Sequence, residues 1–259
     1  MEQYRISFIG AGRVSKALAQ VLYNTGFKIE EIVSKSGVSS RTLADLCNAS
    51  PKHDLNFTDS ADIIIVAVPD DAIGGILNKI SCGENVIVAH TAGSIGLDIF
   101  PARINHTGVF YPLQSFSEGR TINFKDIPFF LEASDPHTSK VLNDLAGSTG
   151  GKVHFVDTQR RRLLHVAAVF AANFTNYMLT AGKEITMEAG FQFEILEPLI
   201  GETIRKAFEN GPEVSQTGPA VRMDRGTIDK HAALLAFSPD LQSLYREITE
   251  SIMSYYKKQ

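Results

Sequence analysis

The sequence predicts an α/β fold in which a doubly wound, mostly parallel β-sheet is followed by an all-α domain. Three observations predict it: strand and helix patterns alternate up to residue 157, the strongest strand (residues 61–69) is apolar on both faces, and only helical spacing follows residue 157. A strand with two apolar faces is typical of a parallel sheet that helices cover on both sides. We therefore expect two domains, residues 1–157 and residues 158–259.

The first domain is expected to contain seven strands, separated by turns and helices. A helix with apolar residues on one face follows the first strand and ends near Gly26, and further helices are expected at residues 39–49 and 71–80. Crossovers between parallel strands should be right-handed. The strands are residues 4–10, 29–34, 61–69, 85–90, 108–113, 128–133 and 152–157.

The second domain is expected to consist of helices alone. Gly211 and Pro212 end the second of them, and Pro239 occupies the first turn of the last, where proline is tolerated. The expected helices are residues 158–190, residues 194–210, a segment from about 227 to 237, and residues 239–258.

Composition and charge narrow the class of protein. A net charge of −4 argues against a general electrostatic attraction to nucleic acid or to an anionic membrane surface. The sequence shows no continuous apolar run near the ~18 residues of a membrane span, and the first strand follows the N-terminus without a basic or apolar leader. Cys47 and Cys82 have no metal-like spacing. We expect a cytoplasmic protein without a metal site, a nucleic-acid partner or a membrane partner.

The turn after the first strand carries a dinucleotide-binding signature. Gly10 and Gly12, followed by the small Ser15, match G-x-G-x-x-[G/A] between a strand and a helix. The first glycine allows the turn, the second lets the backbone approach a pyrophosphate, and the third position needs a small residue. The helix N-terminus then offers free N–H groups to the phosphates. A tight turn without a ligand is the alternative. The expected cofactor contacts are Gly10, Ala11, Gly12, Arg13 and Val14.

The end of the second strand favours NADP over NAD. An NAD site usually has Asp or Glu there to accept from the ribose 2′-OH. Here Ser34, Lys35 and Ser36 follow the strand and Arg41 lies one turn into the next helix, so donors and cations are available for a 2′-phosphate. The alternative is that Lys35 and Arg41 are solvated surface charges.

Two further strand ends should reach the cofactor. Val68 and Pro69 follow the central strand, and Asp70 or Asp71 beyond them is expected to cap the next helix.

At the end of the next strand, Thr91 and Ala92 are expected at the nicotinamide, with His90 and Ser94 nearby. A polar strand-to-loop turn without a ligand is the alternative.

The motifs IGAGRVSKAL, AVPDDAI, HTAGS, YPLQSFS, HVAAVFAANF and TGPAVRMDRGT together resemble a bacterial family of Rossmann-like proteins with a C-terminal helical domain. The resemblance covers nearly the whole chain. Members are described as NADP-dependent or coenzyme F420-dependent-type oxidoreductases, similar to the 6-phosphogluconate dehydrogenase-like superfamily, which includes pyrroline-5-carboxylate reductase and ketopantoate reductase. Members often have a His-Pro pair where this chain has Tyr111 and Pro112. The resemblance implies nucleotide binding, reductase or dehydrogenase chemistry, and a homodimer.

The first long helix carries the candidate catalytic histidine. At 3.6 residues per turn, His165, Ala168, Ala172 and Asn176 share one face, and Asn173 lies at its edge. Imidazole has an unperturbed pKa near neutrality, so His165 is a candidate proton donor or carbonyl orienter, with Asn173 bonding the substrate. The alternative is a polar network between helices.

Three consecutive arginines and the connection at residues 216–231 complete the expected substrate site. Arg160, Arg161 and Arg162 are candidates for a substrate carboxylate, although part of this run is expected to be a solvated helix start.

In residues 216–231, Thr217 is expected to bond the substrate and Arg222 to pair with a substrate carboxylate or with Asp224, while Asp224 and Thr227 cap the next helix.

Three functions remain open at this stage. The first is an NADP-dependent reductase or dehydrogenase that acts on a small, anionic carbonyl or imine metabolite. The second is a non-catalytic NADP-binding sensor or partner protein, because a fold alone does not establish an activity. The third is an S-adenosylmethionine-dependent methyltransferase, and the cations near Lys35 argue against it because that ligand has no phosphate.

Overall fold

The computed structural model describes residues 4–58 and 60–258, and the chain divides into two compact units, Met1–Asn173 and Phe174–Gln259. The helix that begins at Thr158 therefore lies with the first unit for its first turns. The domain boundary predicted after residue 157 follows the last strand and stays a prediction.

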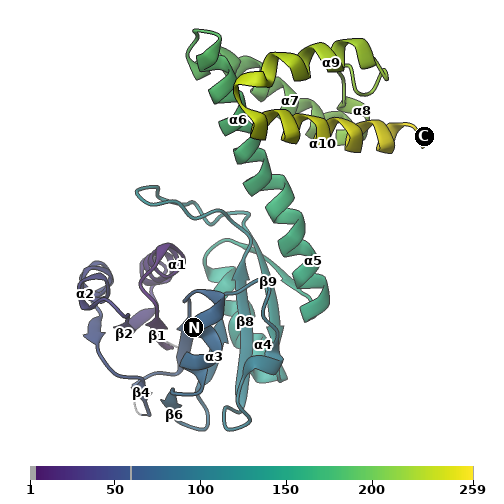
Figure 1. Cartoon of the computed structure of the whole chain (residues 1–259). Coiled ribbons are helices and arrows are strands. Elements are labelled where there is room, and N and C mark those ends of the chain that lie inside the picture. Colours follow the sequence, from purple (N-terminus) through teal and green to yellow (C-terminus); the bar gives the residue numbers. More distant parts are fainter. Residues whose placement is uncertain (1–3, 59, 259) are drawn as a thin grey trace. The chain divides into compact units, whose positions relative to one another are not determined.

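The first unit is built on an eight-stranded sheet in the order β10-β9-β8-β7-β5-β1-β2-β3 (Figure 1). Neighbouring strands are parallel except for β8 and β9. This confirms the doubly wound, mostly parallel sheet. The strands are β1 (Arg5–Ile9), β2 (Lys28–Val33), β3 (Ser50–Lys52), β5 (Ile63–Val66), β7 (Ile87–His90), β8 (His106–Pro112), β9 (Pro128–Ala133) and β10 (Lys152–Phe155), with β4 (Asn56–Phe57) and β6 (Ser81–Cys82) as a separate parallel pair.

Helices cover both faces of this sheet because its central strands are apolar on both sides. In β5, Ile63 and Ile65 belong to one buried cluster, whereas Ile64 and Val66 belong to another. The first cluster includes apolar residues of α1, α2 and α4, and the second includes residues of α3. The helices are α1 (Arg13–Asn24), α2 (Gly37–Leu46), α3 (Asp70–Leu77) and α4 (Pro136–Ser148).

The seven predicted strands are present, and their bounds shift by a few residues. The largest difference is at β5, which ends at Val66 because Ala67 and Val68 leave the sheet before Pro69 begins the next turn. Gly26, with a positive φ of 96°, ends α1 as predicted. The short strands β3, β4 and β6 were not predicted, since two or three residues carry no readable periodicity. The 13-residue helix α4 was not predicted either.

The long helical segment after β10 is not a regular α-helix. It comprises α5 (Thr158–Ala168), the π-helix η2 (Val169–Phe174) and α6 (Thr175–Glu188). A π-turn contains more residues than an α-turn, so the residues after it rotate away from the register of a 3.6-residue projection. The prediction that Asn176 shares a face with His165 is therefore wrong.

This segment is also relevant to the expectation that the chain has no membrane span. Thr158–Glu188 spans 31 residues at a hydropathy of 1.2, which is long and apolar enough to cross a membrane by length and composition alone. The histidine and the asparagines interrupt its apolar run, so the sequence shows no uninterrupted span there although the average hydropathy of the window is high. A single stretch of this kind is weak evidence for a membrane span, although its most apolar window is 0% buried and thus unlike the buried core helix of a soluble protein.

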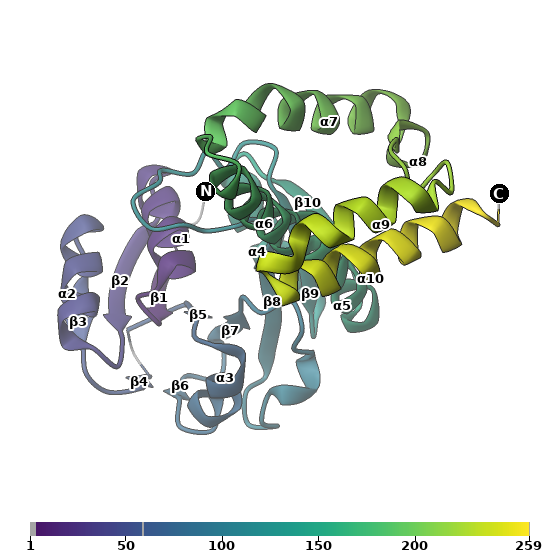
Figure 2. The same ribbon diagram turned by 45° about the horizontal axis from the view of Figure 1, so that its top comes forward.

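The second unit is helical, as predicted, and α9 and α10 run side by side within it (Figure 2). Gly211 has a φ of 91° at the end of α7, and Pro239 lies in the first turn of α10. Asp224 caps α9 by accepting from the backbone N and the hydroxyl of Thr227. Besides α6, the helices are η3 (Phe193–Leu196), α7 (Glu197–Asn210), α8 (Pro212–Ser215), α9 (Arg225–Leu234), η4 (Leu235–Phe237) and α10 (Pro239–Tyr256).

Candidate functional site

The turn after β1 requires glycine at its first position. Gly10 has a φ of 107°, and a Cβ there would lie 2.2 Å from the carbonyl oxygen of Ala67. Its backbone N–H donates to the carbonyl of Val33 at 2.8 Å. The turn is therefore held against the ends of both neighbouring strands, β2 and β5, where a dinucleotide lies in folds of this type.

The N-terminus of α1 leaves backbone donors open. Gly12 is the N-cap residue, no side chain caps it, and the first turn has no acidic residue. A Cβ on Gly12 would meet no described atom within 4 Å, whereas Ser15 is fully buried with its hydroxyl 3.5 Å from the carbonyl of Ala67. Open N–H groups, open space and a partial positive charge fit a pyrophosphate at this helix end.

A cavity of about 860 Å³ adjoins this turn. Its lining includes Ala11, Gly12, Arg13 and Lys16 together with residues 116–122. Val14 packs against the hydrophobic core, so only its backbone faces the turn. The five residues predicted at the pyrophosphate thus lie together, with Arg13 facing the cavity.

The end of β2 presents two unpaired cations. Lys35 and Arg41 are exposed, and neither forms an ion pair with any residue in the described part of the chain. Ser36 caps α2 by accepting from the backbone N of Ser39, and the hydroxyl of Ser34 donates to the carbonyl of Ser36. The two serine side chains therefore shape the turn, while the two cations remain available to an anion.

The segment after β5 leads directly into α3. Val68 is half-buried and Pro69 is the N-cap residue of α3, so the prediction that Asp70 or Asp71 caps this helix is wrong. Proline leads directly into the helix here, which places both aspartates in the first turn. The carboxylate of Asp70 instead accepts a hydrogen bond from the hydroxyl of Ser94.

Thr91 and Ala92 leave β7 next to that aspartate. The backbone N of Thr91 donates to the carbonyl of Val66, and the backbone N of Ala92 donates to Nδ1 of His90 at 3.3 Å. His90 is completely buried and stacks on Phe100, and burial lowers its pKa to about 4. His90 is thus a neutral core residue that orders the turn, and its side chain is not exposed to a ligand. The expectation that His90 lies near the nicotinamide stays a prediction.

A tyrosine and a histidine meet beside this turn. The hydroxyl of Tyr111, near the end of β8, lies 2.9 Å from Nδ1 of His165 on α5. A Cβ on Gly93 would lie 2.8 Å from both His165 Nδ1 and Tyr111 Cζ. Burial, aided by the charge of Asp70, raises the pKa of Tyr111. The sequence showed Tyr111 at a strand end but gave it no role, and only the fold shows that it meets His165.

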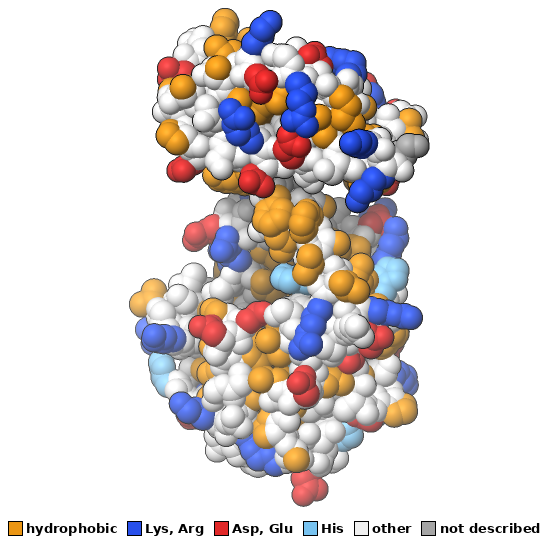
Figure 3. Space-filling view, turned by 45° about the vertical axis from the view of Figure 1, so that its right-hand side comes forward, with side chains coloured by type: hydrophobic (Ala, Val, Ile, Leu, Met, Phe, Trp, Pro, Cys, Tyr) orange, Lys and Arg blue, Asp and Glu red, His pale blue; other side chains and the backbone are white. Residues whose placement is uncertain are grey.

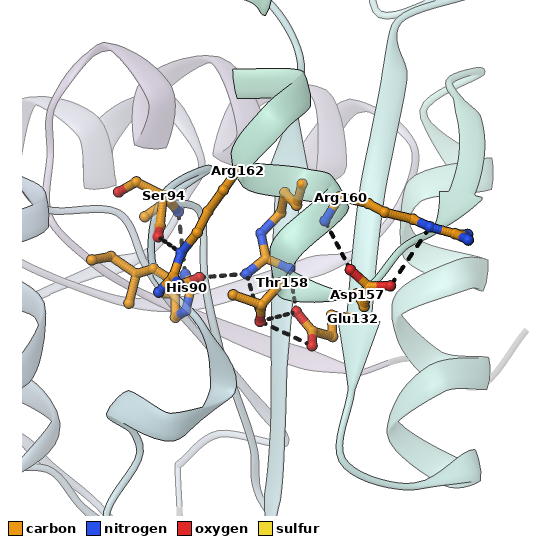
Figure 4. Close-up of polar contacts among 10 residues, drawn as sticks. His90, Ser94, Glu132, Asp157, Thr158, Arg160 and Arg162 are labelled. Atoms are coloured by element: carbon orange, nitrogen blue, oxygen red, sulfur yellow. Dashed lines mark hydrogen bonds and ion pairs between the residues drawn. The ribbon is translucent and has the colours of Figure 1, made fainter. Parts of the chain in front are cut away.

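The three consecutive arginines have three different environments, and Figure 4 labels the first and the third of them, Arg160 and Arg162. Arg160 is exposed and pairs with Asp157 at 3.7 Å. Arg161 is completely buried and binds the carboxylate of Glu132 and the carbonyl of Ile95.

Arg162 is exposed, and its Nε donates to the carbonyl of Ser94 at 2.7 Å (Figure 4). The prediction of Arg161 as a substrate ligand is wrong, because its charge is neutralised in the protein interior. Arg161 and Arg162 together attach α5 to the segment that contains Gly93. Arg162 keeps an exposed guanidinium next to that segment.

The other predicted substrate contacts lie elsewhere in the chain. Asn173 is exposed in the π-helix at the end of the first unit. Thr217 and Arg222 are exposed residues of the second unit, where Thr217 lines a largely apolar groove with Pro219. The roles of these three residues stay predictions.

No metal site accompanies this arrangement in residues 4–58 and 60–258, where no three His, Cys, Asp or Glu residues cluster as metal ligands.

Comparisons with known proteins agree with these motifs. A Rossmann-like domain model matches residues 1–114, and a model for a domain of unknown function, DUF2520, matches residues 127–252. The chain is 38% identical to a Bacteroides fragilis protein described as a "putative NADP oxidoreductase"; the match covers 98% of this chain and 99% of that one, with a TM-score of 0.87. This chain belongs to the same family of Rossmann-like proteins with a DUF2520 domain. The resemblance identified from the motifs is confirmed.

More distant structures share the fold of this DUF2520 protein. An imine reductase from Myxococcus stipitatus in complex with NADP+ is 15% identical, over 98% of this chain and 93% of that one, with a TM-score of 0.67. A pyrroline-5-carboxylate reductase from Coxiella burnetii is 15% identical, over 99% and 98%, with a TM-score of 0.57. None of the curated proteins matches the chain.

Proposed function

We propose that this chain is an NADP-dependent oxidoreductase that transfers a hydride between NADP(H) and a small, anionic carbonyl or imine compound. The observation that carries the proposal is the glycine turn: Gly10 allows the backbone to approach, and Gly12 leaves open donors and open space at α1. The cofactor prediction agrees with the description of the 38% identical relative as an NADP oxidoreductase.

The choice of NADP over NAD rests on charge. Lys35 and Arg41 flank the start of α2, whose first turn has no acidic residue. A 2′-phosphate placed there would gain charge-assisted hydrogen bonds and a favourable helix end, whereas a ribose hydroxyl would find no carboxylate acceptor.

Bound NADPH would supply the hydride, and the chain's own residues would place the substrate against it. Arg162 is our candidate for the anionic group of the substrate, because its exposed guanidinium lies next to Ser94 at the end of β7. Asn173, Thr217 and Arg222 are further candidates for substrate contacts. Guanidinium binds carboxylate in a fixed two-point geometry, which would orient the reacting carbon.

The experiment combines binding with turnover. The purified protein is tested by thermal shift with NADPH, NADH and S-adenosylmethionine, and then assayed for NADPH oxidation with pyruvate, glyoxylate and 1-pyrroline. NADPH stabilisation with turnover supports the proposal. NADPH stabilisation without turnover favours the alternative, a non-catalytic NADP-binding sensor, and stabilisation by S-adenosylmethionine alone would overturn both.

We also propose that the protein is a cytoplasmic homodimer that needs no membrane or nucleic acid. Apolar side chains lie at the surface of both units (Figure 3). Leu163 and Phe170 of the first unit and Leu199 and Phe208 of the second are each more than half exposed. Large exposed apolar side chains are typical of protein contacts. Light scattering during size-exclusion chromatography tests the dimer, and a monomer at all concentrations would contradict it.

A further inference from the structure

The contact between Tyr111 and His165 joins two elements that are far apart in the sequence. The residues are 54 positions apart, and their rings meet edge to face with centroids 5.8 Å apart. The last residue pair between β7 and β8 is His90 with Val109, and Tyr111 lies two residues further along β8. The phenol therefore stands at the same edge of the sheet as the glycine turn.

Gly93 brings the backbone of the β7 end against this pair. The position of its absent Cβ is 2.8 Å from His165 Nδ1 and from Tyr111 Cζ, which is closer than a real side chain could lie. Gly93 follows Thr91 and Ala92, the residues expected at the nicotinamide. Thus the phenol and the imidazole contact the segment that directly follows the residues expected at the nicotinamide.

Both sides of the pair are held firmly. Arg161 fixes the first turns of α5 through Glu132 of β9 and the carbonyl of Ile95, and Arg162 binds the carbonyl of Ser94. His165 lies one turn further along the same helix. These bonds set the distance between α5 and the 93–95 segment, so the hydroxyl of Tyr111 has a fixed partner.

We propose that Tyr111 is the proton-donating catalytic residue of this enzyme and that His165 is the residue that positions its hydroxyl. The inference rests on the proposed function. It differs from the sequence-based hypothesis, in which His165 itself donates the proton, by giving Nδ1 of His165 the task of holding the phenol.

In the proposed reduction, NADPH is the hydride donor and Tyr111 is the proton donor. Bound NADPH would supply a hydride to the substrate carbon, and the π-electron pair of the C=O or C=N bond would move to the oxygen or nitrogen. That atom takes the proton from Tyr111 Oη, and the resulting phenolate accepts a hydrogen bond from Nδ1–H of His165 until solvent returns a proton. Burial raises the pKa of Tyr111 above its ordinary value near 10, so the phenol is protonated at neutral pH.

The test compares three variants, Tyr111→Phe, His165→Leu and His165→Gln, with the wild type. Each is measured for NADPH affinity by fluorescence, for melting temperature, and for kcat and KM with pyruvate, glyoxylate and 1-pyrroline. We expect Tyr111→Phe to bind NADPH as the wild type does and to lose about 100-fold or more in kcat with little change in KM. His165→Leu should lower kcat as well, and His165→Gln, which keeps an N–H donor, should restore part of it.

A second readout needs no substrate. In protein labelled with ¹³C at tyrosine Cζ, the signal absent from Tyr111→Phe belongs to Tyr111, and its ionisation is followed by NMR. We expect the pKa of Tyr111 to change in His165→Leu and to return toward the wild-type value in His165→Gln.

The outcomes separate the two proposals. A wild type that is active while Tyr111→Phe keeps its kcat, or a Tyr111 pKa indifferent to His165→Leu, overturns the inference and leaves the proposed function standing. A wild type that binds no NADPH, or binds it and reduces none of the three compounds, overturns the proposed function and this inference with it.

Discussion

The guanidinium of Arg161, which is completely buried, pairs with the carboxylate of Glu132 on β9. Removing one member of a buried ion pair leaves an uncompensated charge, which costs about 3–5 kcal/mol. We therefore expect Glu132→Ala to lower the free energy of unfolding by that amount in urea titrations.

The matched control for that change is Arg160→Ala, because Arg160 pairs with Asp157 at the surface and should matter by less than about 1 kcal/mol. The double variant Arg161→Met with Glu132→Leu should be more stable than Glu132→Ala alone, since neither charge then remains buried. Equal losses in Glu132→Ala and Arg160→Ala would show that the pair does not hold α5 to the sheet.

Alanine substitutions at the two glycines of the turn after β1 should lower stability by different amounts. Gly10→Ala places a Cβ 2.2 Å from the carbonyl of Ala67 at a positive φ, so we expect it to lose at least about 3 kcal/mol of stability. Gly12→Ala meets no described atom and should cost about 1 kcal/mol or less, as an N-cap change does.

Gly12→Ala should nevertheless weaken NADPH binding about tenfold or more, because its methyl group enters the space of the pyrophosphate. Unfolding curves and NADPH titrations measure the two effects separately. Unchanged NADPH affinity in a well-folded Gly12→Ala protein would place the phosphates elsewhere.

Gly93→Ala should disturb the pair of Tyr111 and His165 without touching the glycine turn. Its methyl group would overlap both rings, and overpacking of this kind costs about 1–3 kcal/mol. Turnover should fall more than NADPH affinity.

Gly75→Ala in α3 is the control, since Gly75 is exposed, has no described atom near its Cβ position, and should gain about 1 kcal/mol from helix propensity. If Gly93→Ala behaves like Gly75→Ala in both assays, the close approach of Gly93 is not needed for activity.

His90 should make the protein less stable in acid. Burial, and after it the charge of Arg161, lowers the pKa of His90 from 6.5 to about 4, with Asp70 opposing the shift. The unfolded chain therefore binds a proton at a pH where the folded protein does not. Stability is full above pH 6.5 and falls by about 3 kcal/mol as the pH drops to 4.

Urea unfolding between pH 7 and pH 4 measures this loss. His90→Phe, which preserves a ring against Phe100, should show a shallower pH dependence than the wild type by the contribution of one proton. Parallel pH curves for the two proteins would assign the acid sensitivity to another group.

Much of the fold could be predicted from the sequence because the signals of each strand, turn and helix lie within a few consecutive residues. The strand, the turn and the helix around Gly10 and Gly12 are adjacent in the chain, and each glycine has its own steric reason. The alternation of apolar strands and amphipathic helices determines the sheet in the same way. The order and the direction of β8 and β9 depend on longer contacts, and no local pattern shows that this one pair is antiparallel.

The site was harder to predict for the same physical reason. Tyr111 and His165 are 54 residues apart, and Glu132 and Arg161 are 29 apart, so no spacing in the sequence shows that they meet. A run of three arginines looks solvated, yet burial depends on what packs over each side chain. The π-helix at η2 also breaks the regular projection, and no residue in it signals the change.

The measurement that tests the central claim most directly is a fluorescence titration of the pure protein with NADPH and NADH, repeated for the variant Lys35→Glu with Arg41→Glu. The account predicts that the wild type binds NADPH about tenfold more tightly than NADH or better, as two charge-assisted contacts to a 2′-phosphate require. It also predicts that the double variant loses this preference while NADH binding changes little. No saturable NADPH binding, or an equal loss of both cofactors in the variant, would contradict it.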